Sequence, residues 1–205
     1  KTMGIPFLQG VAFYGFGVGA WQRMTMNNMP KPDLSQVENA TQTSSVTNSG
    51  ASFTPDKNIG FGFKVMAVIG TYPESMAFNS DASLSAEFNG SGLNYIKFNL
   101  DFWCMAELTK RSEAPVLGTA YIEYSPPTKE FLMGANALIN RPPITTMGIG
   151  NPNDRVNLSL YLNGKTNKWY FLCGTPNQTN NVKVLGVTAW EYLMLGNDIG
   201  QFVKN

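Results

Sequence analysis

The sequence predicts an all-β domain, built as a Greek-key sandwich or a jelly roll. Apolar and polar residues alternate with a period of two in several separate runs. Turn residues, chiefly Gly, Pro and Asn, separate these runs. No convincing long helix is predicted, and no internal repeat is visible, which argues against a propeller or a solenoid.

The first 58 residues divide into two parts of opposite character. Residues 1–24 are apolar and rich in glycine, whereas residues 25–58 are dominated by Ser, Thr, Asn and Gln. A polar segment of this kind cannot bury enough apolar surface to order itself alone. We therefore expect residues 1–58 to form an N-terminal arm and a polar strap that lie along a neighbouring subunit. The alternative is that residues 11–20 form an ordinary edge strand.

The β pattern becomes regular after this segment, so the sandwich is expected over residues 59–195, followed by a C-terminal tail over residues 196–205. A first strand is predicted over residues 59–69, and the clearest one covers residues 94–102. The two faces of that second strand differ in character, with Asn94, Ile96, Phe98, Leu100 and Phe102 on one and Lys97, Asn99 and Asp101 on the other.

Further strands are predicted toward the C-terminus. Residues 116–124 form the next one, and residues 130–140, which are apolar and rich in Ala, fit either a helical turn or a strand. Residues 156–162 alternate and lead into Asn163-Gly164, a pair typical of a tight hairpin turn. The last two strands are residues 169–173 and residues 182–190, the latter with a bulge near Leu185-Gly186.

The expected core is carried by apolar side chains from three of these strands. A buried free cysteine behaves as a small hydrophobe, so the two cysteines, which both lie in apolar runs, are expected to be reduced core residues. Cys104 and Cys173 are these cysteines, and the core side chains are Ile96, Phe98, Leu100, Leu158, Leu160, Trp169 and Phe171.

The chain has no histidine. This removes Ser-His-Asp and Cys-His catalysis and histidine-ligated metal sites. A glycosidase needs two facing carboxylates, and the pairs Asp101 with Glu107 and Glu123 with Glu130 are candidates, but solvated surface acids are the simpler interpretation. The sequence therefore predicts a protein that is not an enzyme, with no catalytic, cofactor-binding or metal-binding residues and no cofactor.

Charge is sparse along the chain. Charged residues make up 14% of it and the net charge is +1, against about 25% charged residues in an ordinary soluble domain. Because charge is depleted at interface cores, this composition favours faces buried against neighbours, and a secreted β domain with a neutral surface fits it equally well. A near-neutral chain is not expected to attract nucleic acid or anionic membrane over long range.

Two stretches carry a family resemblance. In the first, Ser91-Gly92-Leu93 opens a strand to Leu100, and a charged loop at Lys110-Arg111 precedes residues 116–124. In the second, residues 156–160 are followed by residues 168–173, an Asn/Pro turn and the strand from Val182 onward. This order, with an aromatic pair at the start of the penultimate strand, resembles the small coat-protein domain of plant picorna-like viruses (the comovirus and cheravirus group of secoviruses). That pair is Trp169-Tyr170.

The resemblance, which covers somewhat less than half of the chain, implies an eight-stranded antiparallel jelly-roll sandwich with an extended N-terminal arm. Such a subunit assembles with other jelly-roll subunits into an icosahedral virion shell that encloses RNA. The expected partners are other coat-protein subunits and, at the inner surface, viral RNA, with no membrane. Release from a polyprotein fits a chain that starts at Lys1. The expected location is the virion and, during assembly, the host-cell cytoplasm.

A carbohydrate-binding β-sandwich is the alternative function. In such lectin-like modules, exposed aromatic rings stack on the faces of sugars. The candidate rings are Trp21, Trp103, Trp190 and Tyr192.

Overall fold

The computed structural model describes residues 4–27, 52–141, 144–146 and 155–203. Over these residues the protein is all-β, as predicted, with only two short 3-10 turns. The elements are β1 (Ile5–Leu8), β2 (Val11–Trp21), β3 (Met24–Asn27), β4 (Ser52–Pro55), β5 (Ile59–Thr71), β6 (Phe78–Asn89), β7 (Gly92–Cys104), η1 (Leu108–Glu113), β8 (Val116–Ser125), β9 (Glu130–Arg141), β10 (Ile144–Thr146), β11 (Val156–Asn163), β12 (Lys168–Cys173), β13 (Asn180–Val184), β14 (Val187–Glu191), β15 (Leu193–Gly196) and η2 (Gly200–Phe202).

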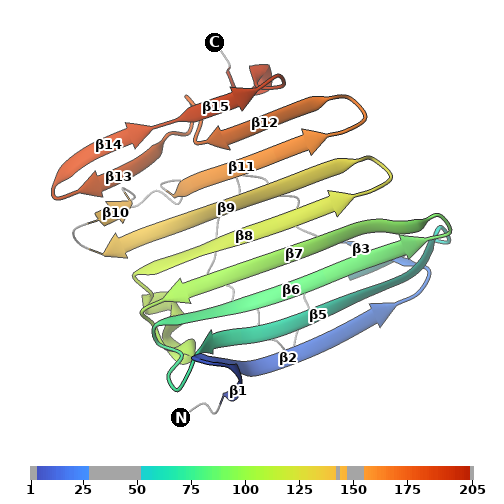
Figure 1. Ribbon diagram of the computed structural model, residues 1–205, viewed down its shortest axis with the longest axis horizontal. Helices are drawn as coiled ribbons and strands as arrows, with labels where there is room; N and C mark the ends of the chain where they lie inside the picture. Colours follow the sequence, from blue (N-terminus) through green and yellow to red (C-terminus); the bar gives the residue numbers. More distant parts are fainter. Residues whose placement is uncertain (1–3, 28–51, 142–143, 147–154, 204–205) are drawn as a thin grey trace.

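One large antiparallel sheet contains all the described strands except β3 and β4, which form a hairpin of their own. The long strands follow one another in chain order, β2, β5, β6, β7, β8 and β9, and β11, β12 and β15 continue the series from β9. Figure 1 shows these strands side by side, with the β3–β4 hairpin on one side of the sheet. We call the series from β2 to β15 the meander.

This order differs from the connectivity of the expected eight-stranded jelly roll. A jelly roll needs Greek-key connections that cross between two sheets. Here each long strand pairs with the next, and short turns such as the two residues Gly90 and Ser91 join them. Alternation predicts the strands themselves but does not specify which strands pair. The antiparallel all-β class is confirmed, and from β5 to β9 the described strands follow a simple meander.

The N-terminal segment joins the sheet. β2 pairs with β5 from Val11 to Trp21, so the strand alternative, not the free arm, describes residues 11–20. The sheet therefore begins before residue 59, and β1 pairs with the start of β2. Most of the expected polar strap, residues 28–51, lies outside the described residues.

Two C-terminal expectations are resolved by backbone geometry. Residues 130–140, which fitted either a helical turn or a strand, form β9, paired with β8 on one side and β11 on the other. Residues 182–190 were expected as one bulged strand, and this was wrong. Leu185 and Gly186 have φ angles of 50° and 86°, so they form a tight turn between β13 and β14.

The register divides the meander into two faces of opposite character. Directly paired residues point to the same side, so each face can be followed from strand to strand. One side, the apolar face, carries the alternate apolar residues. The other side, the polar face, carries the ionisable residues Lys64, Asp81, Glu87, Lys97, Asp101, Glu123, Glu130 and Lys168.

The β3–β4 hairpin is anchored on the polar face by Glu87. The indole Nε1 of Trp21 and the backbone N–H of Met26 both donate to Glu87 Oε1, each at 3.1 Å. Gly62 lies between Trp21 and Glu87 in the register. A Cβ at residue 62 would overlap the Trp21 ring, so glycine is required there for the ring to lie against β5.

We therefore expect Gly62→Ala to destabilise the fold by about 1–3 kcal/mol, because the added methyl group displaces the Trp21 ring. Urea unfolding monitored by tryptophan fluorescence measures the change. The matched control is Gly19→Ala in β2, where a Cβ meets no atom within 4 Å. Equal stability of the two variants would contradict the expected role of Gly62.

Candidate functional site

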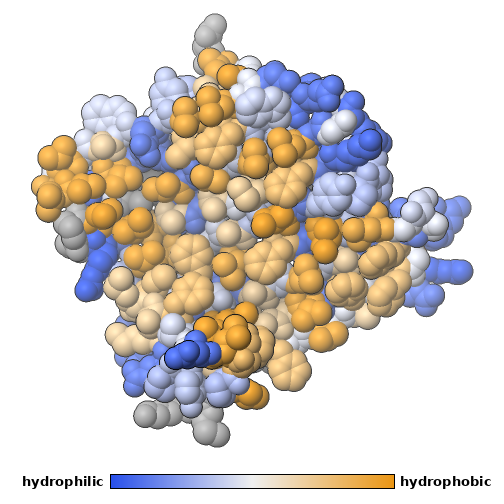
Figure 2. Space-filling view, in the orientation of Figure 1, coloured by the Kyte–Doolittle hydropathy of each residue, from blue (hydrophilic) through white to orange (hydrophobic). Residues whose placement is uncertain are grey.

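The most unusual surface of the protein is the apolar face, which no described element covers. Figure 2 looks onto this face and shows hydrophobic side chains gathered over the strands of the meander. Where the strands of the meander pair with one another from β5 to β12, this face carries no Asp, Glu, Lys or Arg, and Arg141 stands at its margin, where the end of β9 pairs with β10. A face of this size without charge is typical of a surface that contacts another apolar surface.

The residues expected to form the core lie on this open face. Phe98 is 37% exposed and Trp169 is 41% exposed. Ile96, Leu100, Leu158, Leu160 and Phe171 are half-buried, and so are both cysteines. Their expected burial was wrong, because the described chain supplies no second sheet to cover them.

Large and small side chains are separated along the strands of this face. Two neighbouring rows of large residues form what we call the ridge, in which Ala86 is a small member: Phe63, Val65, Leu84, Ile96, Phe98, Ile122, Tyr124, Phe131, Met133, Leu160, Leu162, Trp169 and Phe171. The next two rows, which we call the trough, contain mainly small residues on β6, β8 and β9: Ser80, Ala82, Gly118, Ala120, Ala135 and Ala137. Larger residues interrupt these rows on β5, β7 and β11: Ile69, Leu100, Phe102, Val156 and Leu158.

The middle of the polar face is buried, which reverses the usual arrangement of a half-exposed sheet, whereas Lys168 at its margin is 55% exposed. Lys97 and Glu87 are each 1% exposed. The Nζ atom of Lys97 lies 3.5 Å from Glu123 Oε2. Burial lowers the pKa of Lys97, and the negative charge of Glu123 opposes that shift. A buried amine can remain charged here because a carboxylate compensates it.

A second polar cluster lies where β6, β7 and η1 meet. Arg111 donates to both carboxylate oxygens of Asp81, at 2.9 and 2.8 Å, and its Nε donates to Asn79 Oδ1 at 2.7 Å. The same guanidinium lies 4.0 Å from the ring centroid of Trp103. Asp101 is paired with Asp81 in the register. Burial, and then the charge of Asp81, raise the pKa of Asp101 to about 6.

Buried amides continue this network toward the C-terminal strands. Arg155 Nη1 donates to Asn136 Oδ1 at 2.8 Å, and Asn136 Nδ2 donates to Thr119 Oγ1 at 2.6 Å. The backbone N–H of Asn157 donates to Asn180 Oδ1 at 2.8 Å. These residues were not predicted from the sequence as a buried network. In the sequence they occupy the polar positions of alternating strands, and such positions are ordinarily interpreted as a face exposed to solvent.

The carboxylate pairs considered for glycoside hydrolysis have other partners. Glu123 pairs with Lys97. Glu130 accepts hydrogen bonds from Tyr161 Oη at 2.9 Å and from Asn163 Nδ2 at 3.1 Å. Hydrogen bonding by Thr128, and then by Tyr161 and Asn163, lowers the pKa of Glu130. Asp101 lies on the polar face beside Asp81. Each of these acids is therefore held by neighbours within the sheet. The acids of the two candidate pairs do not face each other as catalytic carboxylates would.

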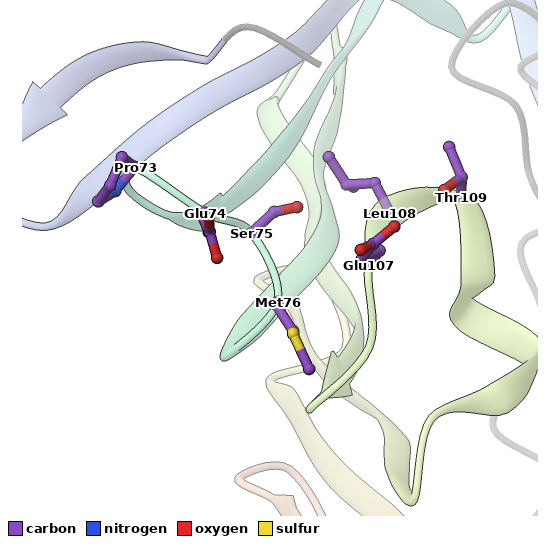
Figure 3. A pocket seen from close by; sticks show the side chains of 7 residues that line it. All are labelled: Pro73, Glu74, Ser75, Met76, Glu107, Leu108 and Thr109. Carbon is purple, nitrogen blue, oxygen red and sulfur yellow. The ribbon is translucent and has the colours of Figure 1, made fainter. Parts of the chain in front are cut away.

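Glu107 lies away from the sheet faces, in a pocket of about 360 Å³ between the loop at residues 73–76 and residues 107–109. Figure 3 shows the two loops facing each other across it. The polar side chains of this pocket are Glu74, Ser75, Glu107 and Thr109, which include two carboxylates and no cation. Within the described part of the chain, no group of His, Cys, Asp and Glu could hold a metal ion. None of the described helical segments has the length and apolarity to cross a membrane.

The aromatic residues considered for sugar binding are not brought together. Trp21 is buried against Glu87, and Trp103 lies under Arg111. Trp190 and Tyr192 are exposed, at 70% and 54%. Only these two rings are therefore accessible to a ligand.

The raised pKa of Asp101 makes stability depend on pH. The folded-state pKa of about 6 exceeds the ordinary 3.8, so folding favours the protonated acid, and this stabilisation is lost as pH rises from about 4 to about 6. We expect Asp101→Asn to be more stable than the wild type above about pH 6, with the difference disappearing below about pH 4. Urea titrations across this range test it, with Glu74→Gln in the exposed loop as control. A difference that did not vary with pH would contradict this assignment.

Comparisons with known proteins assign no family to this chain. No protein-family model matches the sequence, and no curated protein or solved structure is detectably similar to it.

Proposed function

We propose that this protein is a structural subunit, not an enzyme, which buries the apolar face of its sheet against a protein partner in an assembly. The observation that carries the proposal is the charge-free exposed face that the register defines from β5 to β12. Within the described residues, the ionisable side chains of the polar face serve structural hydrogen bonds and ion pairs.

The size of the apolar face supports an interface. The meander contains eight strand spacings of about 4.8 Å, and the rise from Val116 to Tyr124 is eight residues at about 3.3 Å each. These dimensions give a face of roughly 38 by 26 Å, or about 1,000 Å². Monomeric proteins rarely expose an apolar patch larger than a few hundred Å², so a face of this area is expected to be covered in the functional state.

The open edges of the sheet favour a protein partner over a hydrocarbon phase. Among the described strands, β1 pairs only with Val11–Phe13 of β2, which leaves most of the outer edge of β2 without a neighbouring strand. In hydrocarbon, each unsatisfied backbone N–H or C=O costs several kcal/mol. In an aqueous assembly, water hydrates this edge while the apolar face is buried.

The icosahedral coat protein is the narrower form of this proposal, and it rests on the sequence resemblance. The strand order lends it no support, because the described strands follow a meander in place of jelly-roll connections. RNA contact and a virion location belong to that narrower form. The broader proposal, an assembly subunit, does not depend on them.

A carbohydrate-binding module is the second candidate, and the exposure of Trp190 and Tyr192 is the observation that favours it. A flat ring on an edge hairpin can stack on a sugar. Retention on a glycan column that Trp190→Ala abolishes would support this candidate. Assembly of the unliganded protein through the apolar face would favour the structural subunit.

The proposal predicts that polar substitutions on the ridge abolish assembly without unfolding the chain. The test is the triple variant Phe98→Thr, Ile122→Thr and Leu160→Thr, since threonine keeps a high strand propensity. We expect the wild type to form larger species in light scattering and the variant to remain monomeric with an unchanged circular dichroism spectrum. Val187→Thr, at an exposed position of β14 outside the meander, is the control. A wild-type chain that stays monomeric at high concentration and binds no hydrophobic dye would refute the proposal.

A further inference from the structure

We propose that the partner on the apolar face is a second copy of this chain, packed sheet against sheet about a two-fold axis. The inference rests on the proposed function and names its partner. The axis lies between the two sheets and runs perpendicular to the strands, so that each strand crosses its own counterpart in the opposite direction.

The area of the face fits such a dimer. A face of about 1,000 Å² on each copy gives a total buried area of about 2,000 Å², which is where obligate homodimer interfaces begin. Homodimer interfaces are also more apolar than transient ones. The apolar face meets both conditions without any contribution from the loops.

The distribution of large and small side chains makes the centre of the face, at β8 and β9, self-complementary. A two-fold interface requires that one surface fit a copy of itself. Rotation about the proposed axis places the ridge of one copy over the trough of the other. Facing sheets pack about 10 Å apart, and a ridge over a trough keeps this spacing uniform, whereas a ridge over a ridge would hold the sheets apart.

β8 shows this relation most directly. It is the middle strand of the meander, so it lies nearest the axis and is displaced least by the twist between packed sheets. Ile122 belongs to the ridge, is 42% exposed, and is two residues from Ala120 in the trough. In the dimer, Ile122 of each copy lies against Ala120 of the other.

The charge distribution is also compatible with self-association. A two-fold axis brings identical surfaces together, so any net charge on the face would be opposed by the same charge. Where the strands of the meander pair with one another from β5 to β12, the face carries no acidic or basic side chain, and its titratable side chains there are Cys104, Tyr124 and Cys173. Tyr124 and Trp169 place their polar groups in the outermost row of the ridge, where water can reach them at the rim of the interface.

A charge-complementation experiment tests both the partner and the geometry. Ile122→Lys and Ala120→Glu are prepared separately, and the mass of each protein is measured by size-exclusion chromatography with light scattering. We expect a wild-type dimer and at least a tenfold weaker self-association for each variant, because the buried charge has no partner. An equimolar mixture is expected to recover dimers, since the ammonium group introduced in one variant then faces the carboxylate introduced in the other.

Controls separate loss of assembly from loss of fold. Circular dichroism and thermal unfolding are measured for each variant, and a variant that unfolds is replaced by Ile122→Thr or Ala120→Ser. Leu185→Lys, at the turn between β13 and β14 with 80% exposure, adds the same charge outside the apolar face. It is expected to leave the dimer intact.

Each result has a distinct consequence. Dimers in the wild type and in the mixture, with monomers for each folded single variant, support the inference. A wild-type dimer that folded Ile122→Lys does not weaken, or a mixture that stays monomeric, overturns it. If the wild type is a monomer that binds hydrophobic dye, and the triple threonine variant does not bind the dye, the dimer inference is overturned but the proposed function stands. A dye-negative monomer overturns both.

Discussion

The continuous register of the meander is the constraint on which the rest of the structure depends. Each long strand pairs with the next over most of its length. Because side chains alternate along a strand, a slip of one residue would move a whole set of side chains to the opposite face. Lys64, Ser85, Lys97 and Glu123 remain in one row across four strands. The same register joins the apolar residues into one surface.

The cost of this arrangement falls on the polar face. A buried charge is tolerated only with a compensating partner, and the structure supplies Glu123 for Lys97 and Arg111 for Asp81. Asp101 is compensated less completely, which is why its pKa rises. Exposure of the opposite face adds a second cost, since apolar surface in water is unfavourable by about 25 cal/mol per Å². The second cost falls when the apolar face is covered, because burial of that face removes apolar surface from water.

Much of the local structure could be predicted from the residues. The strand over residues 94–102, with Phe98 and Lys97 on opposite faces, follows from period-two alternation, and the turn after Asn163 follows from its turn residues. Residues 182–190 were mistaken for a single bulged strand because a hairpin turn and a bulge both interrupt alternation in the same way. The turn became distinguishable only through the positive φ angles of Leu185 and Gly186.

The sequence by itself determined the all-β class, the sidedness of each strand and the absence of histidine chemistry, because these depend on residue type and spacing alone. The tertiary structure decided which strands pair and which face is covered. Those properties depend on contacts between residues far apart in the chain, such as Trp21 with Glu87 and Arg111 with Asp81. Alternation identifies the two faces of a strand but does not show which of them is buried. Only the three-dimensional arrangement shows that the charged face lies inside and the apolar face lies open.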